Sequence, residues 1–64
     1  MIEPTQDDIG RKVLYIRREP PLKGVITSLM NDRWVFVRYE KDKVDQVTRC
    51  EDLEWVSKLT IVKL

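Results

Sequence analysis

Hydrophobic residues in this chain fall into short runs that are separated by polar turn residues. β-Branched and aromatic side chains dominate the runs, and their apolar positions recur with a period of two, which is typical of β-strands rather than of a long helix. Prolines, glycines and charged clusters lie between the runs, where the chain turns. The predicted strands span residues 12–17, 23–29, 34–39, 45–49 and 59–63, with one short 3₁₀ turn over residues 51–54.

The alternation within each run also predicts which side chains face the core. In the third strand Arg38 needs water, so Trp34, Phe36 and Arg38 are expected on the outside. Leu14, Ile16 and the apolar residues near the C-terminus are expected to form a second, minor cluster. The predicted core consists of apolar and small residues on the inward side: Val13, Tyr15, Gly24, Ile26, Leu29, Val35, Val37 and Tyr39, closed by Val47 and Leu53.

The spacing of these runs predicts a small, strongly bent barrel. Five short strands with tight connections and almost no helix are typical of that architecture. Ile26 and Leu29 are out of phase for a regular strand, so a β-bulge is expected near residues 27–28. Sixty-four residues allow one domain, and no linker or change of composition divides them.

The composition excludes several kinds of chemistry. With one cysteine and no histidine, the chain cannot form an internal disulfide, a Cys/His zinc site or a nucleophile activated by a histidine base. The 12 basic residues against 11 acidic ones leave a net charge of +1, which disfavours binding to nucleic acid by bulk electrostatics. No small-molecule substrate is indicated.

Neither a membrane segment nor a signal peptide is expected. No apolar run approaches the ~20 residues needed to cross a bilayer. The N-terminal residues 1–8 are acidic and lack the basic and apolar regions of a signal peptide. The lone Cys50 fits a reducing compartment, so a cytoplasmic location is expected.

Four parts of the chain occur in an order found in a known class of barrel. They are a glycine before the first strand, a small residue with Val and Ile on the second, a Val-x-Val-x-aromatic run on the third, and an Asp-Leu pair in a turn: Gly10, Gly24, Val25, Ile26, Val35, Val37, Tyr39, Asp52 and Leu53. Over residues 9–55 this order resembles the Tudor-like and KOW-like members of the SH3-like barrel class. The resemblance implies a five-stranded SH3-like barrel with a short 3₁₀ turn before the last strand.

A second resemblance concerns biological origin. Residues 4–13, 24–28, 35–39 and 48–55 resemble small proteins encoded by tailed bacteriophages and prophages, a group without an assigned activity. This resemblance implies an accessory protein that acts in the cytoplasm of a bacterial host. It implies no substrate.

Tudor-type readers hold a methylated lysine or arginine in a cage of several aromatic rings by cation–π attraction. The resemblance places the cage positions at Arg17, Leu22 and Tyr39, of which only Tyr39 is aromatic. One ring does not form a cage, so recognition of methylated residues is not expected.

Exposed aromatic side chains flanked by arginine are typical of protein interface hot spots, and equally of platforms that stack nucleic-acid bases. The candidate binding residues are two such aromatics and the arginines that neighbouring strands can bring beside them: Trp34, Phe36, Arg38, Arg33, Arg49 and Arg17. Two alternatives remain open. Residues 55–64 cover the rings as a second core, or a change of register exchanges the two faces.

Glu51, Asp52 and Glu54 surround one turn, and paired carboxylates can act as general acid and base or bind a hard cation. No complete set of catalytic roles accompanies them. Arg49 favours a lower pKa for the Cys50 thiol, whereas the acidic neighbours oppose it, so Cys50 is expected to be a small residue near the surface. No catalytic residue, metal ligand or cofactor is predicted.

The sequence therefore predicts a non-catalytic binding module, not an enzyme, whose partner is a protein such as a host factor or a second copy of the chain. Addition of a free edge strand to a partner's sheet is an alternative form of that contact. Nucleic-acid binding through the same aromatic and arginine surface is a second candidate function, and a structural role in the virion or its assembly is a third. Salt dependence separates the first two, because phosphate contacts weaken steeply with ionic strength.

Overall fold

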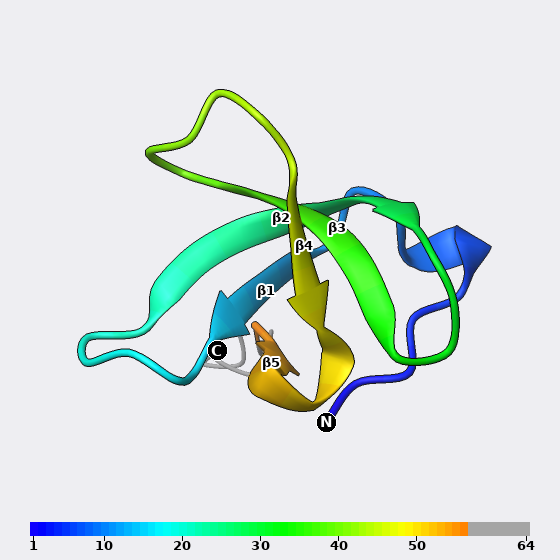
Figure 1. Cartoon of the computed structure of the whole chain (residues 1–64), viewed down its shortest axis with the longest axis horizontal. Helices are drawn as coiled ribbons and strands as arrows, with labels where there is room; N and C mark the ends of the chain where they lie inside the picture. Colours follow the sequence, from blue (N-terminus) through cyan, green and yellow to red (C-terminus); the bar gives the residue numbers. More distant parts are fainter. Residues whose placement is uncertain (57–64) are drawn as a thin grey trace, which may run out of the picture.

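The computed structural model describes residues 1–56, and this part of the chain contains strands joined by loops and two 3₁₀ turns (Figure 1). The strands are β1 (Lys12–Tyr15), β2 (Leu22–Leu29), β3 (Trp34–Tyr39), β4 (Gln46–Arg49) and β5 (Leu53–Trp55), and the turns are η1 (Gln6–Asp8) and η2 (Cys50–Asp52). The strand predicted over residues 59–63 lies outside the described residues. Within residues 1–56, no helix is long and apolar enough to span a bilayer.

All five strands form one antiparallel sheet in the order β4-β3-β2-β1-β5, which confirms the predicted all-β fold. β4 and β5 are the outer strands, and no pairing between described residues joins them, so the sheet is not closed into a barrel. These two outer strands are consecutive in the chain and are linked by η2, the gold turn in Figure 1. The sheet therefore curls far enough for one short turn to connect its two edges.

The hydrophobic core lies on the inner face of this curled sheet. Alternate residues of the strands supply most of it, with further residues from η2 and the N-terminus: Val13, Ile26, Val35, Val37, Tyr39, Leu53, Cys50 and Ile2. Val35 and Val37 are completely buried, whereas Arg38 is exposed. The predicted inner and outer sides of the third strand are therefore confirmed.

The predicted β-bulge in the second strand is also confirmed. The pairing register of β2 with β3 shifts between Ile26 and Ser28. The shift returns Leu29 to the inner face, opposite Val35, where it packs against the core. Thr27 occupies the bulge, and its hydroxyl donates a hydrogen bond to the carbonyl of Phe36 at 3.3 Å.

The prediction that Val47 closes the core is wrong. Val47 lies opposite Phe36 on the outer face of the sheet, and 44% of its surface is exposed. Thr48 occupies the inner position instead, opposite Val35, and only 6% of its surface is exposed. A polar residue is tolerated there because its hydroxyl lies 2.8 Å from the Tyr39 hydroxyl, which satisfies it.

The turn predicted over residues 51–54 is shorter than expected and is followed at once by a strand. η2 ends at Asp52, and β5 pairs with β1, with Leu53 opposite Tyr15 and Trp55 opposite Val13. Leu53 is completely buried, as predicted. Pairing with β1 lets this short segment bury Leu53 completely and pack the half-buried Trp55 against the core.

Candidate functional site

Two rows of side chains on the outer face of β3 and β4 bring the predicted aromatic residues together. Trp34 lies opposite Arg49, and Phe36 lies opposite Val47. Both rings are half-buried, whereas Val47 and Arg49 are exposed. Because side chains opposite one another in an antiparallel pair lie about 5 Å apart, these four residues form a continuous surface, which we name the aromatic patch.

The loop before β3 fixes the position of Trp34. The Asn31 side-chain oxygen accepts hydrogen bonds from the backbone N–H groups of Arg33 at 2.8 Å and Trp34 at 3.0 Å. Asparagine is favoured in turns because its side chain can bond the backbone two residues on. The carbonyl of Arg33 accepts a hydrogen bond from the Cys50 N–H at 2.8 Å, which ties this loop to the end of β4.

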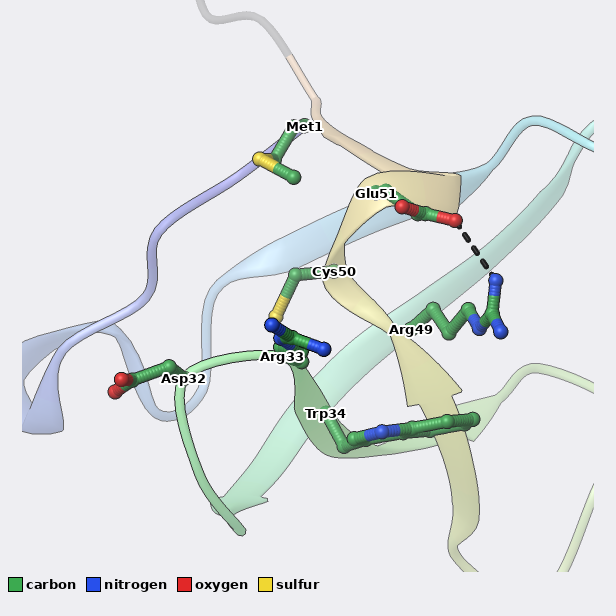
Figure 2. Close-up of a pocket in the computed structure, with 7 residues that line it drawn as sticks. All are labelled: Met1, Asp32, Arg33, Trp34, Arg49, Cys50 and Glu51. Atoms are coloured by element: carbon green, nitrogen blue, oxygen red, sulfur yellow. Dashed lines mark hydrogen bonds and ion pairs between the residues drawn. The ribbon is translucent and has the colours of Figure 1, made fainter.

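Arg49 contacts both an aromatic ring and a carboxylate. Its guanidinium lies 5.5 Å from the centre of the Trp34 ring, within cation–π range, and its Nη1 lies 2.9 Å from Oε2 of Glu51. Figure 2 shows Arg49 and Trp34 extending from neighbouring strands toward the same side. A pocket of about 230 Å³ adjoins them and is lined by Met1, Asp32, Arg33, Trp34, Arg49, Cys50 and Glu51.

The other candidate arginines differ in their surroundings. Arg33 lines the pocket beside the aromatic patch and makes no ion pair with any described residue. Arg38 lies further along the outer face of β3 and pairs with Asp45 at 2.9 Å. Arg17 follows β1 and its Nε lies 2.7 Å from the carboxylate of Asp52, an ion pair that raises the pKa of Arg17. The structure thus brings Arg33 and Arg49 to the patch but leaves Arg17 outside it.

A pair of aromatic rings that the sequence reasoning missed lies on the inner face. The rings of Tyr15 and Tyr39 meet edge to face, with centres 6.1 Å apart and planes at 73°. Leu22 lies opposite Tyr15 in the β1–β2 register, whereas Arg17 points its guanidinium to Asp52. The alternation of side chains along each strand predicts that both tyrosines face inward. Their contact depends in addition on how β1 and β3 each pair with β2.

Cys50 is not near the surface, and that prediction is wrong. Only 2% of the residue is exposed, because η2 turns its side chain into the core. Its carbonyl accepts a hydrogen bond from the Ile2 N–H at 3.3 Å, so the N-terminal segment packs over it. Burial raises the pKa of the Cys50 thiol, which makes it a poor nucleophile.

The carboxylates around η2 act as partners for arginine side chains. Glu51 binds Arg49 and Asp52 binds Arg17. Within residues 1–56, no group of three or more Cys, Asp or Glu side chains is placed to hold a metal ion.

Comparison of the chain with family models, with curated proteins and with solved structures finds no match. Its function is therefore inferred from the chemistry of its surface.

Proposed function

We propose that this chain is a non-catalytic protein-binding module that contacts its partner through the aromatic patch. The observation that carries the proposal is the placement of Trp34, Phe36 and Val47 in two adjoining rows of the outer face, with 44% of the Val47 surface exposed. Aromatic residues and arginine are enriched where protein interfaces bind most strongly. A partner that covers the patch removes apolar surface from water and gains arginine contacts at its edge.

The pairing of the arginines supports a protein partner over nucleic acid. Arg17, Arg38 and Arg49 each lie within ion-pair distance of a carboxylate. Their charges are therefore already compensated locally, which reduces attraction for phosphate. The net charge of +1 supports the same preference.

We further propose that the fold is an SH3-like barrel of the Tudor-like or KOW-like kind, in an accessory protein of a bacteriophage or prophage that works in the host cytoplasm. The single curled sheet and the 3₁₀ turn that links its edge strands support the barrel. The phage origin and the location rest on the resemblance of the sequence alone.

Capture of partners from a bacterial lysate tests the proposed surface. Val47→Ser and Trp34→Ala are expected to weaken capture of the same protein by about tenfold or more, as for residues at the centre of an interface. Val44→Ser is the matched control, since Val44 is an exposed valine in the β3–β4 loop with 61% of its surface exposed. An equal loss of capture with all three variants would contradict the proposal, and so would unchanged capture with all three.

Salt dependence tests the alternative. Binding through the aromatic patch is expected to change little between low and high salt. Measurable binding to a single-stranded oligonucleotide that weakens steeply with salt would favour the nucleic-acid function instead. A stable homo-oligomer in sedimentation, with no other partner, would favour a structural role in an assembly.

A further inference from the structure

β4 is an edge strand whose outward backbone groups have no strand partner among residues 1–56. On the side that faces β3, the Cys50 N–H donates a hydrogen bond to the carbonyl of Arg33. Alternate residues of an antiparallel strand face the same neighbour, so Thr48 also directs its backbone to β3, whereas Val47 and Arg49 direct theirs to the open side. Free N–H and C=O groups of this kind are a template for another strand.

Space for an added strand lies along this edge. A hollow of about 420 Å³ borders β4 and is lined in part by Tyr15, Leu22, Thr48 and Asp52. A strand that paired with β4 would direct every second side chain into this hollow and the others onto the outer face.

The rows of the aromatic patch determine what the outward side chains of such a strand should be. One of them would lie beside Arg49, and the next outward one beside Val47, because cross-strand rows continue from strand to strand. Val47 is exposed and lies next to Phe36, which favours an apolar neighbour. Arg33 lines the same pocket as Arg49 and has no ion-pair partner among the described residues, so it favours a carboxylate at the position beside Arg49.

We propose that an extended segment of the partner protein adds to β4 as an antiparallel strand, with an acidic residue beside Arg49, any residue next, and a β-branched apolar residue beside Val47. Read from its N-terminus, the segment has the pattern acidic–any–apolar, because the added strand runs opposite to β4. This inference rests on the proposed function and names the mode by which the patch binds.

Titration of the ¹⁵N-labelled full chain with a short synthetic peptide tests the strand addition. The probe has blocked ends and a central Asp-Thr-Val flanked by serine and threonine, and the control peptide has Lys in place of Asp. The Asp peptide is expected to shift the Val47 and Arg49 amide signals, and the Lys peptide to bind more weakly. At nine-tenths saturation, hydrogen exchange of the Val47 amide should slow about tenfold, because only the free fraction exchanges.

Two substitutions at one position separate backbone pairing from side-chain contact. Val47→Pro removes the outward N–H, at a position where an edge strand tolerates proline, and Val47→Ala keeps the N–H but shortens the side chain. Val47→Pro is expected to bind the Asp peptide about tenfold more weakly than Val47→Ala, which is the effect of roughly one lost hydrogen bond. An amide spectrum that retains the dispersion of the original chain shows that each variant is folded.

Several results would overturn the strand addition. The first is equal peptide affinity of the two Val47 variants, and the second is no shift of the edge amides at millimolar peptide. The third is protection of those amides from exchange in the free chain, which would mean that the edge is already covered. Shifts that follow protein concentration alone would assign the edge to a second copy instead. If Val47→Ser abolishes capture from the lysate while Val47→Pro retains it, the proposed function stands and the strand addition fails.

Discussion

The hydroxyl groups of Tyr39 and Thr48 form a buried pair, so their removal singly and together measures what this hydrogen bond contributes. The two oxygens are 2.8 Å apart, and the residues are 8% and 6% exposed. The Thr48 hydroxyl also lies 3.4 Å from the carbonyl of Gln46, a long and weak contact. Each hydroxyl therefore depends mainly on the other.

The expected costs follow from leaving one partner unsatisfied. Tyr39→Phe and Thr48→Val should each lower the free energy of unfolding by about 1–2 kcal/mol, because a buried polar group loses its partner. The double variant should lose clearly less than the sum of the two, since an apolar pair of the same shape leaves nothing unsatisfied. A domain of this size has only about 3–5 kcal/mol from its core, so each single change is a large fraction.

Urea unfolding of the four proteins, followed by tryptophan fluorescence, measures the coupling. A loss of 1 kcal/mol should also lower Tm by about 4–8 °C. Single losses that add to the double loss within about 0.5 kcal/mol would show that the two hydroxyls do not interact. That result would show that the Tyr39 hydroxyl does not satisfy the Thr48 hydroxyl at its inner position. It would also remove the explanation for why Thr48, and not Val47, faces the core.

The same tyrosine makes stability depend on alkaline pH. Burial raises the pKa of Tyr39 above its ordinary value of 10.0. The neutral phenol is thus favoured in the folded state, so its contribution is fully present below about pH 10 and is lost as the pH rises through the folded-state pKa. Between pH 8 and 11, the urea midpoint of Tyr39→Phe should therefore fall less than that of the original chain. An equal fall of the urea midpoint in the two proteins over this pH range would contradict the role of Tyr39.

Three further changes test other parts of the structure. Gly24→Ala should lower the free energy of unfolding by about 1–3 kcal/mol in urea, because the new Cβ lies 2.6 Å from Val37 Cγ1, and a near-neutral result would mean that this packing is wrong. Cys50 should react with a thiol reagent only at the rate of unfolding, so fast reaction in the absence of denaturant would contradict its burial. Arg17→Ala should change stability little, because exposed ion pairs contribute little, and it should leave partner capture unchanged, because Arg17 lies outside the aromatic patch.

Much of the central sheet follows from the sequence because its third strand has a strong pattern. Valine at positions 35 and 37, with Arg38 on the opposite side of the strand, leaves one sensible choice of inner face, and the phase change from Ile26 to Leu29 requires a bulge. β4 has no such pattern, since Val47 is its only apolar residue and hydrophobicity alone sends it inward. The structure reverses this because pairing with β3 determines the phase of β4 and Tyr39 satisfies the hydroxyl of the inward residue.

Only those features of the candidate site that are determined within a single strand could be predicted from the sequence. The outward direction of Trp34 and Phe36 follows from alternation, but the choice among arginines depends on contacts between distant residues. Arg17 pairs with Asp52, 35 residues away in sequence, and no local pattern indicates that contact. The same limit explains β5, whose three residues become a strand only because β1 lies beside them.

Val47 connects the two proposals, and the geometry of β4 explains why. In an antiparallel ladder, the residues between two inward-bonded positions direct their backbone to the opposite side, and alternation sends their side chains to the opposite face. The pairing that places Thr48 in the core therefore gives Val47 an exposed side chain on the aromatic patch and an N–H on the edge that has no partner among residues 1–56. A serine at this position weakens only the patch, whereas a proline also blocks the edge. If the added strand supplies much of the affinity, proline should be the more damaging of the two, although it retains more apolar surface than serine.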